Sequence, residues 1–163
     1  MENLQHYQAL ESMYLAAPIN EFYLPRIKVQ EAQADIEIEL HKKYFHTAGA
    51  VHGSVYFKML DDAAFFAAAS LEKEYFVLTT SFTTYITRPV SKGRMKAVGK
   101  VVNINSSQFI VESVVYDGED REIGRGNGLF VRSKMLLLDV PGYQLKGLNL
   151  LREEFSEPIE RNL

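Results

Sequence analysis

The amino-acid sequence predicts an α+β fold in which one enclosed helix lies against an antiparallel sheet. Three observations predict it: residues 27–40 alternate between apolar and polar side chains, residues 54–72 form an Ala- and Phe-rich segment, and residues 75–132 contain four β-prone segments separated by turn signals. A period of two is typical of a half-buried strand. A run of strands after a single helix is typical of α+β proteins.

The N-terminal segment is expected to be a helix followed by the first strand. Apolar residues recur at i, i+3 and i+4 over residues 2–17, which is the helical rhythm. Pro18 and Asn20 end this pattern. In the strand predicted over 27–40, one face carries the apolar side chains Ala34, Ile36, Ile38 and Leu40.

The central helix is predicted directly after the turn at Gly53. Ser54 is the expected N-cap, and the helix is expected to reach about Glu72. After Asp61 and Asp62 the middle of the helix contains only Ala and Phe, so most of its faces are expected to be enclosed. A carboxylate on such a helix is costly unless it is paired or hydrogen-bonded. The presence of these two acids therefore requires an explanation.

Four further strands are predicted, each bounded by residues that favour turns. They are expected at Tyr75–Thr87, Gly93–Asn105, Gln108–Tyr116 and Arg121–Arg132. Pro89 ends the first of them, because proline cannot continue a sheet ladder.

The rest of the chain is a C-terminal tail over about 134–163, with a short helix expected near residues 145–155. No internal repeat or low-complexity linker divides the sequence. We therefore expect a single domain over 1–163, with an N-terminal helical extension over about 1–24.

The composition argues against several classes of function. A net charge of -3 argues against a broad nucleic-acid or anionic-membrane surface. The absence of Cys excludes a disulfide framework, a Cys-ligated metal and a thiol nucleophile, and the four histidines show no metal-ligand spacing. The longest apolar stretch, residues 63–69, is far shorter than the roughly 20 residues that cross a bilayer. The start of the chain lacks a secretory signal, so we expect a soluble cytoplasmic protein that uses no metal.

Residues 46–69 form the most informative segment of the chain. A small-residue turn that contains His46 and His52 leads directly into the central helix. A glycine turn at a helix start exposes backbone N–H groups that can stabilise a developing negative charge. Together with an acid on the helix, these groups indicate a hydrolytic site.

Two motifs resemble those of hotdog-fold thioesterases of the phenylacetate-degradation (PaaI) type. The first motif, Asn/His-x-x-Gly-x-x-His-Gly-Gly followed by a helix bearing Leu-x-Asp, is matched by His46, Gly49, His52, Gly53, Met59 and Asp61. The second, Val-Thr followed by a strand ending in Leu-Arg-Pro, is matched from Leu78-Thr79 through Thr87-Arg88-Pro89. The resemblance covers residues 27–132 and implies the hotdog fold, a long central helix wrapped by a curved antiparallel sheet.

The resemblance also implies hydrolysis of an acyl thioester, with acyl-CoA as the expected substrate and no cofactor other than the coenzyme A of that substrate. It implies a homodimer whose sheets join edge to edge, often paired again into a tetramer, and active sites to which two chains contribute. Independently of the resemblance, the edges of an open sheet need a cover or a partner.

Asp61 is the expected nucleophile or general base toward the thioester carbonyl, and Gly53 the expected donor of the backbone N–H that polarises its oxygen. His52 is expected to position the loop or to donate to the carbonyl. His46 is expected to bond Asp61 or the attacking water; a purely structural or surface role is the alternative for both histidines. Adjacent helix positions point about 100° apart, so Asp61 and Asp62 are not both expected to face this site. The resemblance selects Asp61 and implies that Asp62 is a polar residue at the helix edge or in an interface.

Three further residues are candidates by resemblance. Thr79 matches a Ser or Thr that comes from the partner chain in relatives and holds the water or the carboxylate, although Thr is also common in strands. Arg88 is a candidate for a coenzyme A phosphate. Ser54 replaces the second Gly of the motif and would add a hydroxyl near the carbonyl. Aromatic residues of the helix either line an acyl pocket or belong to the core: Tyr56, Phe57, Phe65 and Phe66.

Departures from the family pattern leave other functions open. The loop over 103–108 lacks the Gly-Lys pair that many relatives bring to the nucleotide, so an acyl carrier protein or another thioester remains an alternative substrate. A non-catalytic acyl-CoA-binding module and an acyl dehydratase or hydratase are the alternative functions. The motif lacks the Pro-Gly turn typical of carrier-protein dehydratases, which argues against the last.

Overall fold

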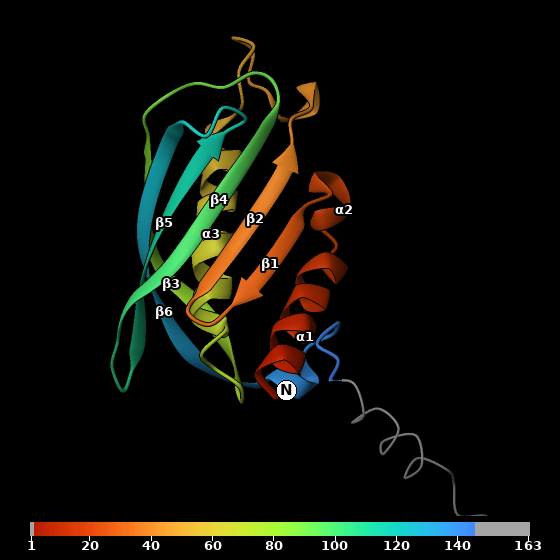
Figure 1. The fold of residues 1–163 in the computed structure, drawn as a ribbon, viewed down its shortest axis with the longest axis vertical. Helices are drawn as coiled ribbons and strands as arrows, with labels where there is room; N and C mark the ends of the chain where they lie inside the picture. Colours follow the sequence, from red (N-terminus) through yellow and green to blue (C-terminus); the bar gives the residue numbers. More distant parts are fainter. Residues whose placement is uncertain (1, 146–163) are drawn as a thin grey trace, which may run out of the picture.

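A computed structural model describes residues 2–145 of the chain as one antiparallel sheet and the helices packed on it (Figure 1). The sheet has six strands in the order β1-β2-β4-β5-β6-β3. The strands are β1 (Arg26–Gln30), β2 (Gln33–Glu39), β3 (Tyr75–Ile86), β4 (Arg94–Ile104), β5 (Gln108–Asp117) and β6 (Glu122–Leu136). The helices are α1 (Glu2–Ala16), α2 (Asn20–Tyr23) and α3 (Gly53–Ala69), with short 3-10 turns at Lys42–Tyr44 and Leu137–Asp139.

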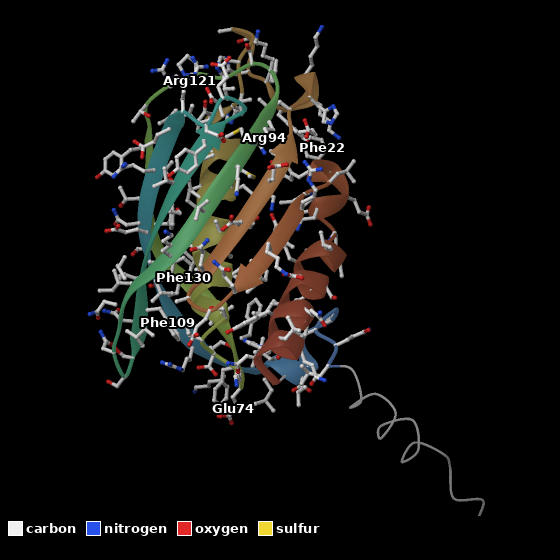
Figure 2. The ribbon with its side chains drawn as sticks, viewed as in Figure 1. Phe22, Glu74, Arg94, Phe109, Arg121 and Phe130 are labelled. Carbon is white, nitrogen blue, oxygen red and sulfur yellow. The ribbon has the colours of Figure 1, made fainter. Side chains whose placement is uncertain are left out.

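The central helix α3 lies against one face of the curved sheet, as the sequence predicts (Figure 1). Its backbone approaches β4 so closely that a Cβ on Gly99 would lie 2.2 Å from the carbonyl oxygen of Ala63. On the next strand, the Ser113 hydroxyl donates to the carbonyl of Leu60 at 2.9 Å. Phe109 of β5 and Phe130 of β6 are register partners, fully buried, and lie close together in Figure 2.

The strand predicted over 27–40 is a hairpin of two strands. β1 and β2 pair antiparallel from Gln30 and Gln33 outward, with Glu31 and Ala32 in the turn. Ala32 takes the left-handed conformation (φ 57°), and its N–H donates to the Ser70 hydroxyl at 2.8 Å. The prediction was wrong because this turn contains neither Gly, Pro nor Asn, the usual turn residues.

The ends of α3 also differ from the prediction. The helix begins at Gly53 and ends at Ala69, and its N-cap is His52 instead of Ser54. The His52 Nδ1 atom accepts a hydrogen bond from the Ser54 N–H at 3.1 Å. Histidine is not among the preferred N-cap residues, which is why the sequence pointed to the serine.

The C-terminal part of the described chain packs on the N-terminal helix. Strand β6 continues to Leu136 instead of ending at Arg132. Beyond it, the Tyr143 hydroxyl lies 2.7 Å from His6 Nδ1, and His6 Nε2 lies 3.0 Å from the carbonyl oxygen of Ala69. The helix expected near 145–155 lies, apart from its first residue, outside the described residues. Within residues 2–145, no helix combines the length and apolar character needed to cross a membrane.

Candidate active site

Asp61 faces a cavity of about 550 Å³ between α3, β3, the end of α1 and the C-terminal segment. Most of its lining is apolar or aromatic. The lining residues fall into three groups: Met13, Tyr14, Ala16, Ala17, Pro18, Ile19 and Asn20; Lys58, Asp61, Asp62, Phe65 and Phe66; Phe76, Leu78, Thr79, Val140 and Pro141. A carboxylate in such surroundings is poorly solvated, which is how proteins tune acids for catalysis.

The Asp61 carboxylate is held by one hydroxyl and perturbed by its surroundings. The Thr79 hydroxyl donates to its Oδ1 atom at 3.0 Å. Burial raises the pKa of Asp61 to about 6, and the negative charge of Asp62 acts in the same direction. The Thr79 hydrogen bond and the Lys58 ammonium lower this pKa and only partly offset the burial. The pKa of Asp61 therefore lies nearer to neutral pH than that of an ordinary Asp, which makes its carboxylate a more effective base.

A β-bulge follows Thr79 in β3. The register between β3 and β6 shifts between Thr79 and Ser81, so that Thr80 is the extra residue. Before the bulge, the side chains of Val77 and Thr79 face the helix layer. After the bulge, the side chain of Phe82 faces this layer, and its ring centroid lies 5.7 Å from that of Phe57 on α3. Bulges re-aim side chains in this way and are common beside active sites.

Asp62 lines the same cavity, contrary to the prediction. The 100° between adjacent helix positions turns Asp61 toward β3 and Asp62 toward α1, and the cavity spans both directions. Asp62 accepts from the Lys58 ammonium at 2.5 Å and from the Tyr14 hydroxyl at 2.8 Å. Its charge is thus compensated, whereas Asp61 receives only a neutral hydroxyl.

Gly53 opens onto a second, smaller cavity of about 290 Å³ at the start of α3. His46 and Arg88 line this cavity with it. No acceptor for the Gly53 N–H is found within residues 2–145, so this donor is available at the first position of the helix, where the macrodipole also favours negative charge.

The two halves of the predicted catalytic machinery are separated within one chain. Gly53 and Asp61 are about 12 Å apart along the helix at about 1.5 Å per residue, and they open onto different cavities. Thr79 contacts Asp61 within the same chain, whereas a partner-chain contact was expected. His46 lies on the Gly53 side; its Nδ1 atom accepts from the Ala48 N–H at 3.1 Å, and Asp61 is not its partner.

The remaining candidates divide between core, surface and cavity. Tyr56 belongs to the core and donates its hydroxyl to the Arg88 carbonyl at 2.8 Å. Phe57 is exposed and packs against Phe82, whereas Phe65 and Phe66 line the Asp61 cavity. His52 and Ser54 are exposed, bond each other, and line neither cavity. Within residues 2–145, no group of three or more His, Cys, Asp or Glu side chains is placed to hold a metal ion.

Sequence reasoning missed Tyr14, Lys58 and Phe76 as cavity residues. One signal was available: Lys58 and Asp62 are spaced i, i+4, the spacing at which opposite charges meet on a helix. No comparable signal joins Tyr14 to Asp62, because they lie on different helices and meet only in the folded chain.

Residues 48–123 match the thioesterase superfamily. A Thermoplasma volcanium protein that is provisionally named an esterase is 24% identical over 102 residues, which cover 63% of this chain and 77% of that protein.

Solved structures share the architecture. The PaaI protein from the phenylacetic acid degradation operon of E. coli superimposes with a TM-score of 0.74 at 14% identity, covering 82% of this chain and 97% of that one. A thioesterase family protein from Silicibacter pomeroyi gives a TM-score of 0.73 at 21% identity, covering 77% and 96%. The motif-bearing segment is therefore similar to the thioesterase superfamily, and the sheet wrapped around α3 is the hotdog fold that these solved structures share.

Proposed function

We propose that this protein hydrolyses acyl thioesters, with acyl-CoA as the expected substrate. The observation that carries the proposal is the half-buried Asp61 carboxylate, with a pKa near 6, held by Thr79 in a largely apolar cavity. An acid in this environment can act at neutral pH on a substrate whose acyl group is apolar. Because a thiolate leaves readily, a carboxylate suffices without a Ser-His-Asp triad.

The reaction adds water across the C–S bond. The Asp61 carboxylate takes a proton from a water molecule whose oxygen attacks the thioester carbon, and the carbonyl electron pair moves to an oxygen that accepts from the Gly53 N–H. Collapse of the tetrahedral species breaks the C–S bond, and the proton passes from Asp61 to the departing thiolate. In the alternative path, Asp61 attacks the carbon itself and the C–S bond breaks with departure of the thiolate. Water then adds to the Asp61 carboxyl carbon of the resulting anhydride, which releases the acyl acid, and one proton of the water passes to the thiolate. A single turnover in ¹⁸O-labelled water separates them, because only the second path leaves label in Asp61.

We further propose that the Gly53 N–H comes from a second copy of the chain, since Gly53 and Asp61 do not meet within one. The edge strand β3 supports this arrangement. It is a long strand of 12 residues with no neighbour on its outer side in the described chain, and it exposes Leu78, Tyr85 and Ile86 by 46–55%. Such an edge associates with another strand unless it is covered. A dimer or a dimer of dimers would provide that cover.

The test is a thiol-release assay over short, long and aromatic acyl-CoAs with wild type, Asp61→Asn and a control, Asp120→Asn. We expect Asp61→Asn to lose at least about 100-fold in kcat/KM, the lower end of the effect of a positioned base. The control sits in an exposed turn with φ 58°, which Asn tolerates, and should match wild type.

Unfolding is not expected to explain the loss in Asp61→Asn. Because burial disfavours the Asp61 charge, the variant should be at least as stable as wild type at pH 7. Thiol release that is unaffected by Asp61→Asn would contradict the mechanism. Tight acyl-CoA binding by wild type without turnover would instead support a binding module.

A further inference from the structure

We infer that the end of the N-terminal helix limits the size of the acyl group, and that the cavity accepts an uncharged apolar chain. This inference rests on the proposed function of Asp61. The same cavity that holds the Asp61–Thr79 pair extends to residues 16–20, where α1 ends and α2 begins. An acyl chain whose carbonyl lies at Asp61 would therefore point its far end toward Ala16 and Ala17.

The walls between these two ends suit a hydrocarbon. Phe65 and Phe66 of α3 and Phe76 and Leu78 of β3 line the cavity on one side, and Met13 of α1 lines it on the other. Ligand pockets of about 300–1,000 Å³ are normally lined in this way, with a few polar groups at the reacting end. A volume of about 550 Å³ therefore suits a medium-length acyl chain.

The charges in the cavity disfavour a second carboxylate on the acyl group. Lys58 is the only cationic side chain among the described lining residues. Its ammonium group is already bound to Asp62 at 2.5 Å, and Tyr14 donates to the same carboxylate. The pair is therefore neutral, and the remaining charge is that of Asp61. A dicarboxylic acyl group would meet repulsion there and would lose hydration without gaining a partner.

The wall formed by α1 is fixed at three points. Tyr14 is bonded to Asp62 and packs its ring on Phe66 at 4.9 Å. His6 lies between Ala69 of α3 and Tyr143. A Cβ on Gly142 would lie 2.9 Å from the Ala16 Cβ, so the C-terminal segment packs closely against α1 beside the cavity. Because these contacts hold α1 in place, the length of the cavity that it bounds is also defined.

The experiment measures kcat/KM for saturated acyl-CoAs from C2 to C14, and in parallel the calorimetric Kd of S-alkyl coenzyme A thioethers of the same lengths, which cannot be hydrolysed. In wild type, we expect both quantities to improve about fourfold per added CH₂, the fold-change that corresponds to about 0.8 kcal/mol per buried CH₂, and then to level off. Ala17→Phe should move the levelling point to chains at least two carbons shorter. Leu15→Phe, at an exposed position in the last turn of α1, should follow wild type. Succinyl-CoA should react at least tenfold more slowly than butyryl-CoA.

Each outcome decides the inference. Binding that does not depend on chain length, or an Ala17→Phe series that coincides with wild type, would overturn it; Ala17→Leu provides the same test if the Phe variant does not fold. Succinyl-CoA as a preferred substrate would overturn the charge argument. Graded thioether binding without any hydrolysis would uphold the acyl cavity and refute only the hydrolase proposal.

Discussion

The ionisation of Asp61 is set by neighbours with opposite effects. Burial and the Asp62 charge favour its neutral form, whereas the Thr79 hydroxyl and Lys58 favour its carboxylate. Only the carboxylate can act as a base or nucleophile. Activity should therefore rise with pH through about 6 and stay level above it, as long as no other group titrates.

Thr79→Val tests this balance. Removing the hydroxyl removes a hydrogen bond that favours the carboxylate, so the pKa rises and the midpoint of the kcat/KM profile should move to higher pH by about one unit. Thr79→Ser keeps the donor and should keep the midpoint. A profile that is unchanged in Thr79→Val, or shifted equally in both variants, would show that the contact does not control the acid.

The sequence pointed to Asp61 but not to its surroundings. The resemblance selected this acid through its spacing from Gly53, and Asp61 is the acid whose pKa is raised by burial. The Thr79 contact joins β3 to α3 and forms only when the two elements pack in the folded chain. Tyr14 meets Asp62 only through packing of α1 on α3, which no periodicity encodes.

Helix α3 and strand β4 approach each other closely at Gly99. Gly99 lies directly beneath the helix backbone at Ala63, with no room for a methyl group. Because the obstacle is backbone on a central helix, it cannot move aside as a flexible side chain can. The position of α3 on the sheet, and so of Asp61, depends on this contact.

Gly99→Ala should therefore lower the free energy of unfolding by about 3 kcal/mol, the upper part of the range for overpacking. Gly118→Ala is the matched control, because a Cβ there meets nothing closer than 3.7 Å, and it should change stability by less than about 0.5 kcal/mol. Urea denaturation followed by circular dichroism measures both. Equal stability of the two variants would mean that α3 can shift away from β4 at little cost.

His6 joins three segments: α1, the end of α3 and the C-terminal segment. The Ala69 carbonyl can only accept, so Nε2 carries the proton and Nδ1 accepts from the Tyr143 hydroxyl. Burial lowers the pKa of His6 below 6.5, with the Lys73 charge acting in the same direction, and the hydrogen bond to Ala69 and the Glu72 charge opposing it.

His6 therefore makes the protein less stable in acid. The unfolded chain binds a proton at this residue below about pH 6.5 that the folded chain resists, so the free energy of unfolding falls as pH drops through that value. His6→Gln removes the titration and should flatten this part of the curve. Denaturation at pH 7.5, 6.5 and 5.5 measures the slopes, and parallel curves for the two proteins would exclude His6 as their source.

The order of the elements was predictable because hydrophobic periodicity and turn residues are local signals. Strands β3 to β6 lie close to their expected bounds, and the helix precedes them. The hairpin at Ala32 was not predicted because its two-residue turn contains no Gly, Pro or Asn to mark it. One clue was present: the apolar set changes from odd positions, Ile27 and Val29, to even positions, Ala34 and Ile36.

The separation of Gly53 from Asp61 means that the proposed mechanism requires a site shared between two chains. In the proposed dimer, one chain supplies Asp61 and Thr79, and the other supplies the Gly53 N–H. This N–H can be deleted with little disturbance to the helix. Gly53 is the first residue of α3, where proline is favoured, and His52 before it has φ -65° and ψ 143°, the conformation that precedes proline.

Two inactive variants should therefore restore activity when they share a dimer. Asp61→Asn and Gly53→Pro chains, carrying different affinity tags, are coexpressed and purified over both tags. In the mixed dimer, one site keeps the Asp61 of the Gly53→Pro chain and the Gly53 of the Asp61→Asn chain, while the other site lacks both groups. We expect about half of the wild-type rate per dimer, with each homodimer nearly inactive. If each site were built within one chain, every site of the mixed dimer would lack one group, and the dimer would stay as inactive as its parents. A protein that hydrolyses thioesters while sedimenting as a monomer would contradict the shared site as well.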